Sequence, residues 1–238
     1  KELGMGFRAA TSFSLEKGVV DADSIELRVG ATVAEGDGLF SWQDGPTIDI
    51  NLSMSRLDLE NWQFPVDNAS RRFIEFPELF ATQELPALWQ VMSAIIPGNL
   101  RGAFELEVGL IAWRGQIMRN GHVSAYLEDS VLNLTDMQLF IPGNSGINLS
   151  GTIDANSGEP DINLMFSASS QDLRSLLDWL DIAPSQAAIA PSRLNSFSMF
   201  SNISGTPSRL AIKNINLELD TTVIEGSVTL NDLSPLNV

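Results

Sequence analysis

The stretch that decides the fold is TIDINLSM, Thr47–Met54, in which polar and apolar side chains alternate without a break. A β-strand turns successive side chains to opposite faces of its sheet, so this stretch predicts a strand with one apolar and one polar face. The same rhythm returns at residues 104–110, 162–166 and 215–219. Strands of this kind are typical of antiparallel sheets that have one face in water.

Short pieces of the chain occur twice. Asp49–Leu52 has the same sequence as Asp161–Leu164, and in both copies a proline lies upstream and a Ser-x-x-Asp-Leu motif follows. Glu26–Gly30 is similarly related to Glu105–Gly109. Such self-similarity indicates one supersecondary unit stacked on itself. We therefore expect a mainly β, repetitive fold: a curled antiparallel β-sheet that forms an open groove, with a few short helices.

Three helices are predicted between the strands. Leu173, Leu176, Leu177 and Leu180 have helical spacing, with Ser169 as the expected N-cap. A second helix is expected over residues 86–97, bounded by prolines, and a third from Ser55 to near Trp62. Turns are expected where Gly, Pro, Asn and Asp cluster, namely at residues 37–38, 44–46, 120–121, 142–144, 156–160 and 205–207.

These elements divide one continuous groove domain into four parts. Residues 1–66 form a first β-repeat with a short helix, and residues 67–99 a connection with a helix. Residues 100–182 form a second β-repeat that ends in a helix, and residues 183–238 begin a third. The chain starts at Lys1 without a signal-peptide pattern, so we expect a piece of a longer protein.

Composition narrows the range of partners. The net charge is −16, with 30 acidic against 14 basic residues, so nucleic acid and anionic membrane surfaces are not expected partners. There is no cysteine, which excludes disulfides and thiolate metal sites. No apolar run reaches the roughly 18 residues needed to cross a bilayer.

The sequence offers few residues in patterns suited to catalysis. His122, the single histidine, lies beside the expected turn at residues 120–121 and is interpreted as a surface residue. Asp154-x-Asn156-x-Gly158 resembles the start of a calcium loop, but Met165 stands where the twelfth, acidic ligand belongs, so a hairpin turn is the better interpretation. No catalytic motif is present. We expect no enzyme activity, no cofactor and no metal site.

The apolar faces of the strands are the remaining signal. They could pack against one another in a β-sandwich, or they could line an open trough that lipid, a lid or another protein fills. Periodicity does not distinguish these two arrangements. In the second, the candidate lipid-binding residues are the alternating apolar ones: Ile48, Ile50, Leu52, Met54, Phe104, Leu106, Val108, Leu110, Leu132, Leu134, Ile147, Leu149, Ile162, Leu164, Phe166, Ile215, Leu217 and Leu219.

The order of weak motifs between Gly102 and Leu180 resembles the C-terminal region of the AsmA family, bacterial envelope proteins related to TamB and YhdP. The resembling stretches are ELEVG (Glu105–Gly109), SVLNL (Ser130–Leu134), PGNS (Pro142–Ser145), LSGTID (Leu149–Asp154), and the run from Gly158 through Phe166 to Leu180. No single motif is specific, and the resemblance rests on their order.

The resemblance implies a periplasmic β-groove, anchored in the inner membrane of a Gram-negative bacterium. Such grooves are implicated in moving phospholipid towards the outer membrane and in outer-membrane integrity. The implied ligand is a phospholipid or another acyl lipid, with envelope proteins as possible partners. Two other classes stay open: a structural scaffold with packed apolar faces, and a carbohydrate-binding module with Trp42 or Trp113 exposed.

Overall fold

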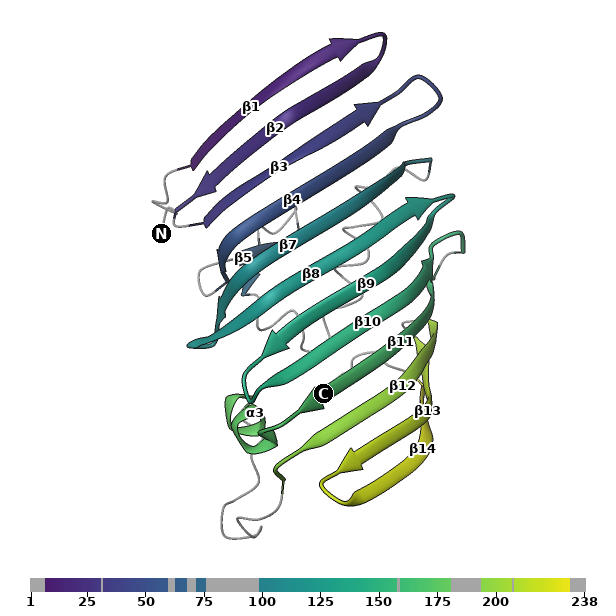
Figure 1. Ribbon diagram of the computed structural model, residues 1–238. Coiled ribbons are helices and arrows are strands. Elements are labelled where there is room, and N and C mark those ends of the chain that lie inside the picture. The colour runs from purple at the N-terminus through teal and green to yellow at the C-terminus, as the bar shows by residue number, and fades with distance from the viewer. Residues whose placement is uncertain are drawn as a thin grey trace.

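The computed structural model describes residues 7–30, 32–59, 63–67, 72–75, 99–157, 159–180, 194–206 and 208–231. Twelve strands form one open sheet, whose spatial order follows the chain from β1 at one edge to β14 at the other (Figure 1). Its strands are β1 (Phe7–Glu16), β2 (Val19–Val29), β3 (Thr32–Ser41), β4 (Thr47–Asp58), β7 (Arg101–Trp113), β8 (Gln116–Glu128), β9 (Val131–Ile141), β10 (Ser145–Asp154), β11 (Asp161–Ser170), β12 (Phe197–Thr206), β13 (Arg209–Leu219) and β14 (Thr222–Asn231).

The expected fold class is confirmed: the protein is mainly β, and its long sheet does not close. Neighbouring strands are antiparallel except for β4 and β7, which is the one parallel pair among the described strands. Because β4 and β7 run in the same direction, the chain must return across the sheet between them. Part of this connection, β5 (Gln63–Asp67) with β6 (Arg72–Glu75), forms a separate two-stranded sheet.

Irregular positions bend the sheet into its curl. The pairing register slips by one residue between Ala22 and Ile25, between Leu134 and Met137, and between Ile212 and Ile215. Such bulges bend a strand and increase its twist. Neighbouring backbones also approach closely at Gly102, where a side chain would collide with the Ile48 carbonyl oxygen.

The described residues contain one helix, α3 (Leu173–Trp179), which follows β11. Asp172 is its N-cap and accepts a hydrogen bond from the Ser175 backbone N–H at 3.2 Å. The predicted N-cap, Ser169, is wrong, because Ser169 and Ser170 are still paired in β11. The Asp172 backbone N–H donates to the Gly143 carbonyl oxygen at 2.9 Å, which fixes α3 against the β9–β10 turn.

Several other local predictions from the sequence are wrong, and some concern residues outside the described ranges. The helix predicted from Ser55 is wrong over residues 55–58, which continue β4, because pairing with β7 satisfies this backbone. Trp62 and the helix predicted over residues 86–97 lie outside the described residues. Residues 37–38 and 120–121 lie inside β3 and β8, so these two predicted turns are wrong. Asn120 has a left-handed backbone (φ 50°), so its turn-like sequence forms an irregularity within a strand.

Candidate functional site

Residues that pair across adjacent strands place their side chains on the same face of a sheet. The pairing therefore traces rows of side chains along the whole sheet. Two such rows cross all twelve strands and contain only apolar residues and glycine. The first, the rim row, is Leu15, Val20, Phe40, Ile48, Gly102, Leu127, Leu132, Ile153, Ile162, Gly205, Leu210 and Leu230.

The next row on the same face, here the second row, is equally free of polar side chains. We call the face that carries both rows the apolar face. The second row is Phe13, Ala22, Gly38, Ile50, Phe104, Ala125, Leu134, Gly151, Leu164, Ile203, Ile212 and Val228.

Most of the predicted lipid-binding residues lie on this face. Seven are members of the two rows: Ile48, Leu132, Ile162, Ile50, Phe104, Leu134 and Leu164. Ten more lie on the same face in rows further along the strands: Leu52, Met54, Leu106, Val108, Ile147, Leu149, Phe166, Ile215, Leu217 and Leu219.

Leu110 is the exception. It lies in register with Arg56 and Arg119, so it shares the opposite, polar face with two charged side chains. Val108 and Ile111 are three positions apart yet belong to one buried cluster, so the alternation changes face at Gly109 and Leu110. Simple alternation along β7 did not indicate this irregularity.

The two ends of the strands differ strongly in burial. We call the ends at Asp58, Trp113, Ile141 and Ser145, together with α3, the α3 rim. There the buried cluster of the sheet is formed by Leu59, Val108, Ile111 and Met118, with Trp113, Ile141 and Trp179 packed against it.

Helix α3 covers part of the α3 rim. The Trp179 ring meets the Trp113 ring edge-on, with 5.2 Å between centroids. Leu173 and Leu176, on the helix, are buried. A side chain on Gly143 would collide with the Asp172 carbonyl oxygen and approach the Leu176 nitrogen at 3.0 Å, so glycine at this turn permits the close packing.

The opposite strand ends, at Ser41, Arg101, Glu128, Asp154 and Arg209, form what we call the open rim. Inside the sheet, Phe40 and Phe104 are the exposed members of the two rows, at 39 % and 37 %, and most other large members are half-buried. The two edge strands expose the row members Leu15 (61 %), Phe13 (63 %), Val228 (47 %) and Leu230 (39 %).

Sequence reasoning missed two groups. The contributions of β1 to β3, β8, β12 and β14 to the rows, such as Phe40, Leu127 and Ile203, were not selected, although their apolar character was visible. Bulges had hidden their alternation. The cluster residues Ile111 and Met118 were also missed, because nothing local showed that they would be buried with Leu59 and Val108.

Hydrogen bonds order both rims. The Ser175 hydroxyl and then its backbone N–H lower the pKa of Asp172 below its ordinary value. At the open rim, hydrogen bonds from Ser208 and Thr206 likewise lower the pKa of Glu159. Nearby, Asp154 Oδ1 accepts from the Asn156 backbone N–H at 2.8 Å, so the calcium-like sequence serves a turn between β10 and β11.

The polar face carries one group of side chains with metal-ligand chemistry within the described part of the chain. Ligand atoms of Glu105, Glu107 and His122 lie within 4.8 Å of one another. His122 lies within β8, opposite Glu107, and its Nε2 is 3.9 Å from Asp136 Oδ2. Exposed acidic groups of this kind are common without an ion.

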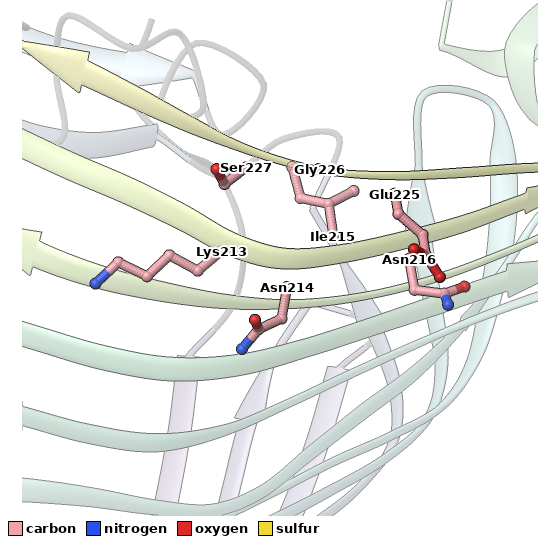
Figure 2. Close-up of a pocket in the computed structure, with 7 residues that line it drawn as sticks. All are labelled: Lys213, Asn214, Ile215, Asn216, Glu225, Gly226 and Ser227. Atoms are coloured by element: carbon pink, nitrogen blue, oxygen red, sulfur yellow. The ribbon is translucent and has the colours of Figure 1, made fainter.

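A hollow of about 550 Å³ marks the bulge in β13. In Figure 2, Ile215 lies beside Gly226, Asn216 lies beside Glu225, and Lys213 extends away from them. Its mixed lining follows from the register slip, which leaves Lys213 and Asn214 outside the regular pairing with β14.

Two tryptophans bear on the sugar-binding interpretation. Trp42 is 48 % exposed and its ring centroid lies 5.5 Å from that of Phe40. Trp113 instead packs against Trp179. The structure therefore presents these two indoles at opposite rims and does not gather them on one platform.

Comparison with protein-family models, curated proteins and solved structures finds no match to this chain. The resemblance to the AsmA family therefore stays a prediction that rests on the motifs quoted above. Among the residues that the structure describes, no helix has the length and apolarity needed to cross a bilayer.

Proposed function

We propose that the apolar face holds the acyl chains of a lipid, as part of a groove that carries phospholipid across the periplasm of a Gram-negative envelope. The observation that carries this proposal is the pair of unbroken rows, which offer no polar side chain over twelve strands. At a strand spacing of about 4.8 Å, this face is on the order of 50 Å long.

The energetics suit binding without chemistry. Burial of each methylene group of an acyl chain contributes about 0.8 kcal/mol. The rows are made of similar aliphatic and aromatic side chains, so neighbouring positions along the face offer a chain nearly equal environments. A lipid can then be held and still slide from one strand to the next. The envelope location and the inner-membrane anchor come from the AsmA resemblance.

A structural scaffold is the second candidate, and one observation favours it. Part of the apolar face, the cluster around Val108 and Met118, is already covered by the chain itself. If the whole face is covered in the same way in solution, no ligand accompanies the protein.

The test is mass spectrometry of an organic extract of this chain, purified from a bacterial periplasm without detergent. We expect stoichiometric phospholipid, which is lost from folded Leu106→Asp, Leu164→Asp and Phe166→Asp variants. Met165→Asp is the matched control, because Met165 is an exposed neighbour of Leu164 on the polar face. A lipid-free extract from folded protein contradicts the proposal and favours the scaffold.

A further inference from the structure

The apolar face differs between its two rims in a way that would orient a ligand. At the α3 rim, Ile111 and Met118 are buried beneath packed side chains. At the open rim, Phe40 and Phe104 remain exposed, although they belong to the same face. An acyl chain can therefore reach the apolar side chains from the open rim without displacing any part of the cluster.

Access from the α3 rim is obstructed by a fixed structure. The edge-to-face contact of Trp113 and Trp179 lies over the strand ends. The helix is tied down at its start, since the Leu173 backbone N–H donates to the Asn195 carbonyl oxygen at 3.0 Å and the Asp172 N–H to Gly143. A ligand that entered here would have to break the packing of α3.

The accessible depth fits one acyl chain. From Gly102 in the rim row to Val108 in the cluster, β7 advances about 20 Å at the usual rise per residue. The hydrocarbon core of a bilayer is about 30 Å thick, so a chain from one leaflet spans about 15 Å. A chain that starts at Gly102 would therefore end about 5 Å before Val108, close to Leu106, which packs against the cluster.

The open rim also has the chemistry to face a head group. Its turns present charged and hydrogen-bonding groups: the Ser208 hydroxyl donates to Glu159 at 2.7 Å, and the Asn156 side-chain amide donates to the Asp129 carbonyl oxygen at 2.9 Å. Arg101 adds a guanidinium, which donates to the Asp44 carbonyl oxygen at 2.8 Å. A hydrated head group can stay in water beside these side chains.

We infer that a lipid lies along the strands with its head group at the open rim and its chain ends against the buried cluster. Helix α3 thereby acts as the stop that limits how deep the chain can go. This inference rests on the proposed function, since it specifies how that same face would be used.

Position-specific quenching tests the orientation. The chain has no cysteine, so single cysteines can carry a fluorophore: Ile48→Cys in the rim row and Leu106→Cys towards the cluster. Glu105→Cys, on the polar face next to Leu106, is the control. If Leu106→Cys does not fold, Val123→Cys replaces it, because Val123 pairs with Leu106. The probes are phosphatidylcholines with a nitroxide on the head group or at the chain end.

We expect the chain-end nitroxide to quench the label at position 106 more than that at position 48, and the head-group nitroxide to do the reverse. Equal quenching at both positions, or the opposite order, overturns the orientation while leaving lipid binding supported. If neither nitroxide quenches either label beyond the Glu105→Cys control, and no lipid elutes with the protein, the proposed function fails as well.

Discussion

The α3 rim and the open rim are built from the same alternating strands, yet they have different surroundings. At the α3 rim the apolar face contains the buried cluster, against which Trp113 and Trp179, the last residue of α3, pack. At the open rim the same face exposes Phe40 and Phe104 inside the sheet, and Leu15 and Leu230 in the two edge strands. The comparison teaches that alternation sets which face is apolar, while the packing of side chains at one end of the strands decides how much of that face is buried.

The largest expected effect on stability comes from a substitution in the buried cluster at the α3 rim. Met118 is buried in the cluster, whereas its neighbour Ile117 is exposed. Met118→Asp buries an unpaired carboxylate and should cost more than about 4 kcal/mol in the free energy of unfolding. Ile117→Asp should stay within about 0.5 kcal/mol of the parent protein. Urea denaturation of both variants measures the difference, and equal losses would show that the cluster is not a folding core.

A smaller loss of stability is expected from a glycine substitution that tests how α3 docks on the β9–β10 turn. Gly143 and Gly115 both have positive φ, at 78° and 69°. Alanine in this region costs roughly 1–2 kcal/mol at either site. Gly143→Ala should cost more, because its new methyl group meets Asp172 and Leu176, whereas nothing lies within 4 Å of the position at Gly115.

Thermal denaturation and near-ultraviolet circular dichroism of the two glycine variants make this comparison. We expect Gly143→Ala to lose part of the tryptophan signal as α3 undocks, and Gly115→Ala to keep it. Identical behaviour of the two variants would mean that the strained backbone, not the helix contact, determines the cost.

Loss of the N-cap in Asp172→Ala should cost about 1 kcal/mol near neutral pH, and part of this contribution depends on pH. The Ser175 hydrogen bonds lower the pKa of Asp172 in the folded state. Its contribution is therefore present above the ordinary carboxyl pKa and is lost as the pH falls through the lowered, folded-state pKa.

Asp172→Asn keeps an oxygen acceptor but does not titrate, so it should remove the acid-dependent loss. The Ser175 amide shift, followed by NMR as the pH is lowered from 6, reports the loss for the parent protein and its absence in the variant. A parent protein whose amide does not respond to acid would exclude Asp172 as the cause.

The smallest effect concerns the open rim. Carboxylates at its turns, among them Glu128, Asp129 and Asp161, outnumber Arg101 and Arg209. Anionic lipids should therefore bind more weakly than zwitterionic lipids at low salt. This difference in binding should decrease as added salt shortens the screening length, which is about 10 Å at 0.1 M. Competition between the two lipids at two salt concentrations measures it, and a preference for anionic lipid would contradict the expectation.

Much of the fold could be predicted from the sequence. Alternation of the type in Thr47–Met54 indicated the strands, and the repeats indicated an open, repetitive sheet. The errors occurred where tertiary pairing overrides a local signal. Ser55–Leu59 and Ser169–Leu173 share a motif, but the first continues a strand beside β7 and the second leads into α3.

The apolar face could also be predicted from alternation, and its one wrong residue lies where the alternation changes. Seventeen of the eighteen selected residues lie on the apolar face because strands alternate strictly between bulges. Leu110 lies on the other face because the alternation changes between Val108 and Ile111, which are both buried in the cluster. The covered end of the face could not be predicted, because its buried cluster joins residues that lie far apart in the chain, from Leu59 to Trp179.

The parallel pairing of β4 with β7 bears on how the protein folds. The Ala103 backbone N–H donates to Asp49 Oδ1 at 2.9 Å across 54 positions of sequence, whereas most other neighbouring strands are joined by short turns. Closing such a long loop is entropically costly and slow compared with forming hairpins. We expect β1–β4 and β7–β14 to assemble first as separate ladders. Until they join, each exposes a long unpaired edge, and during this interval the chain is most open to misassembly with its own copies.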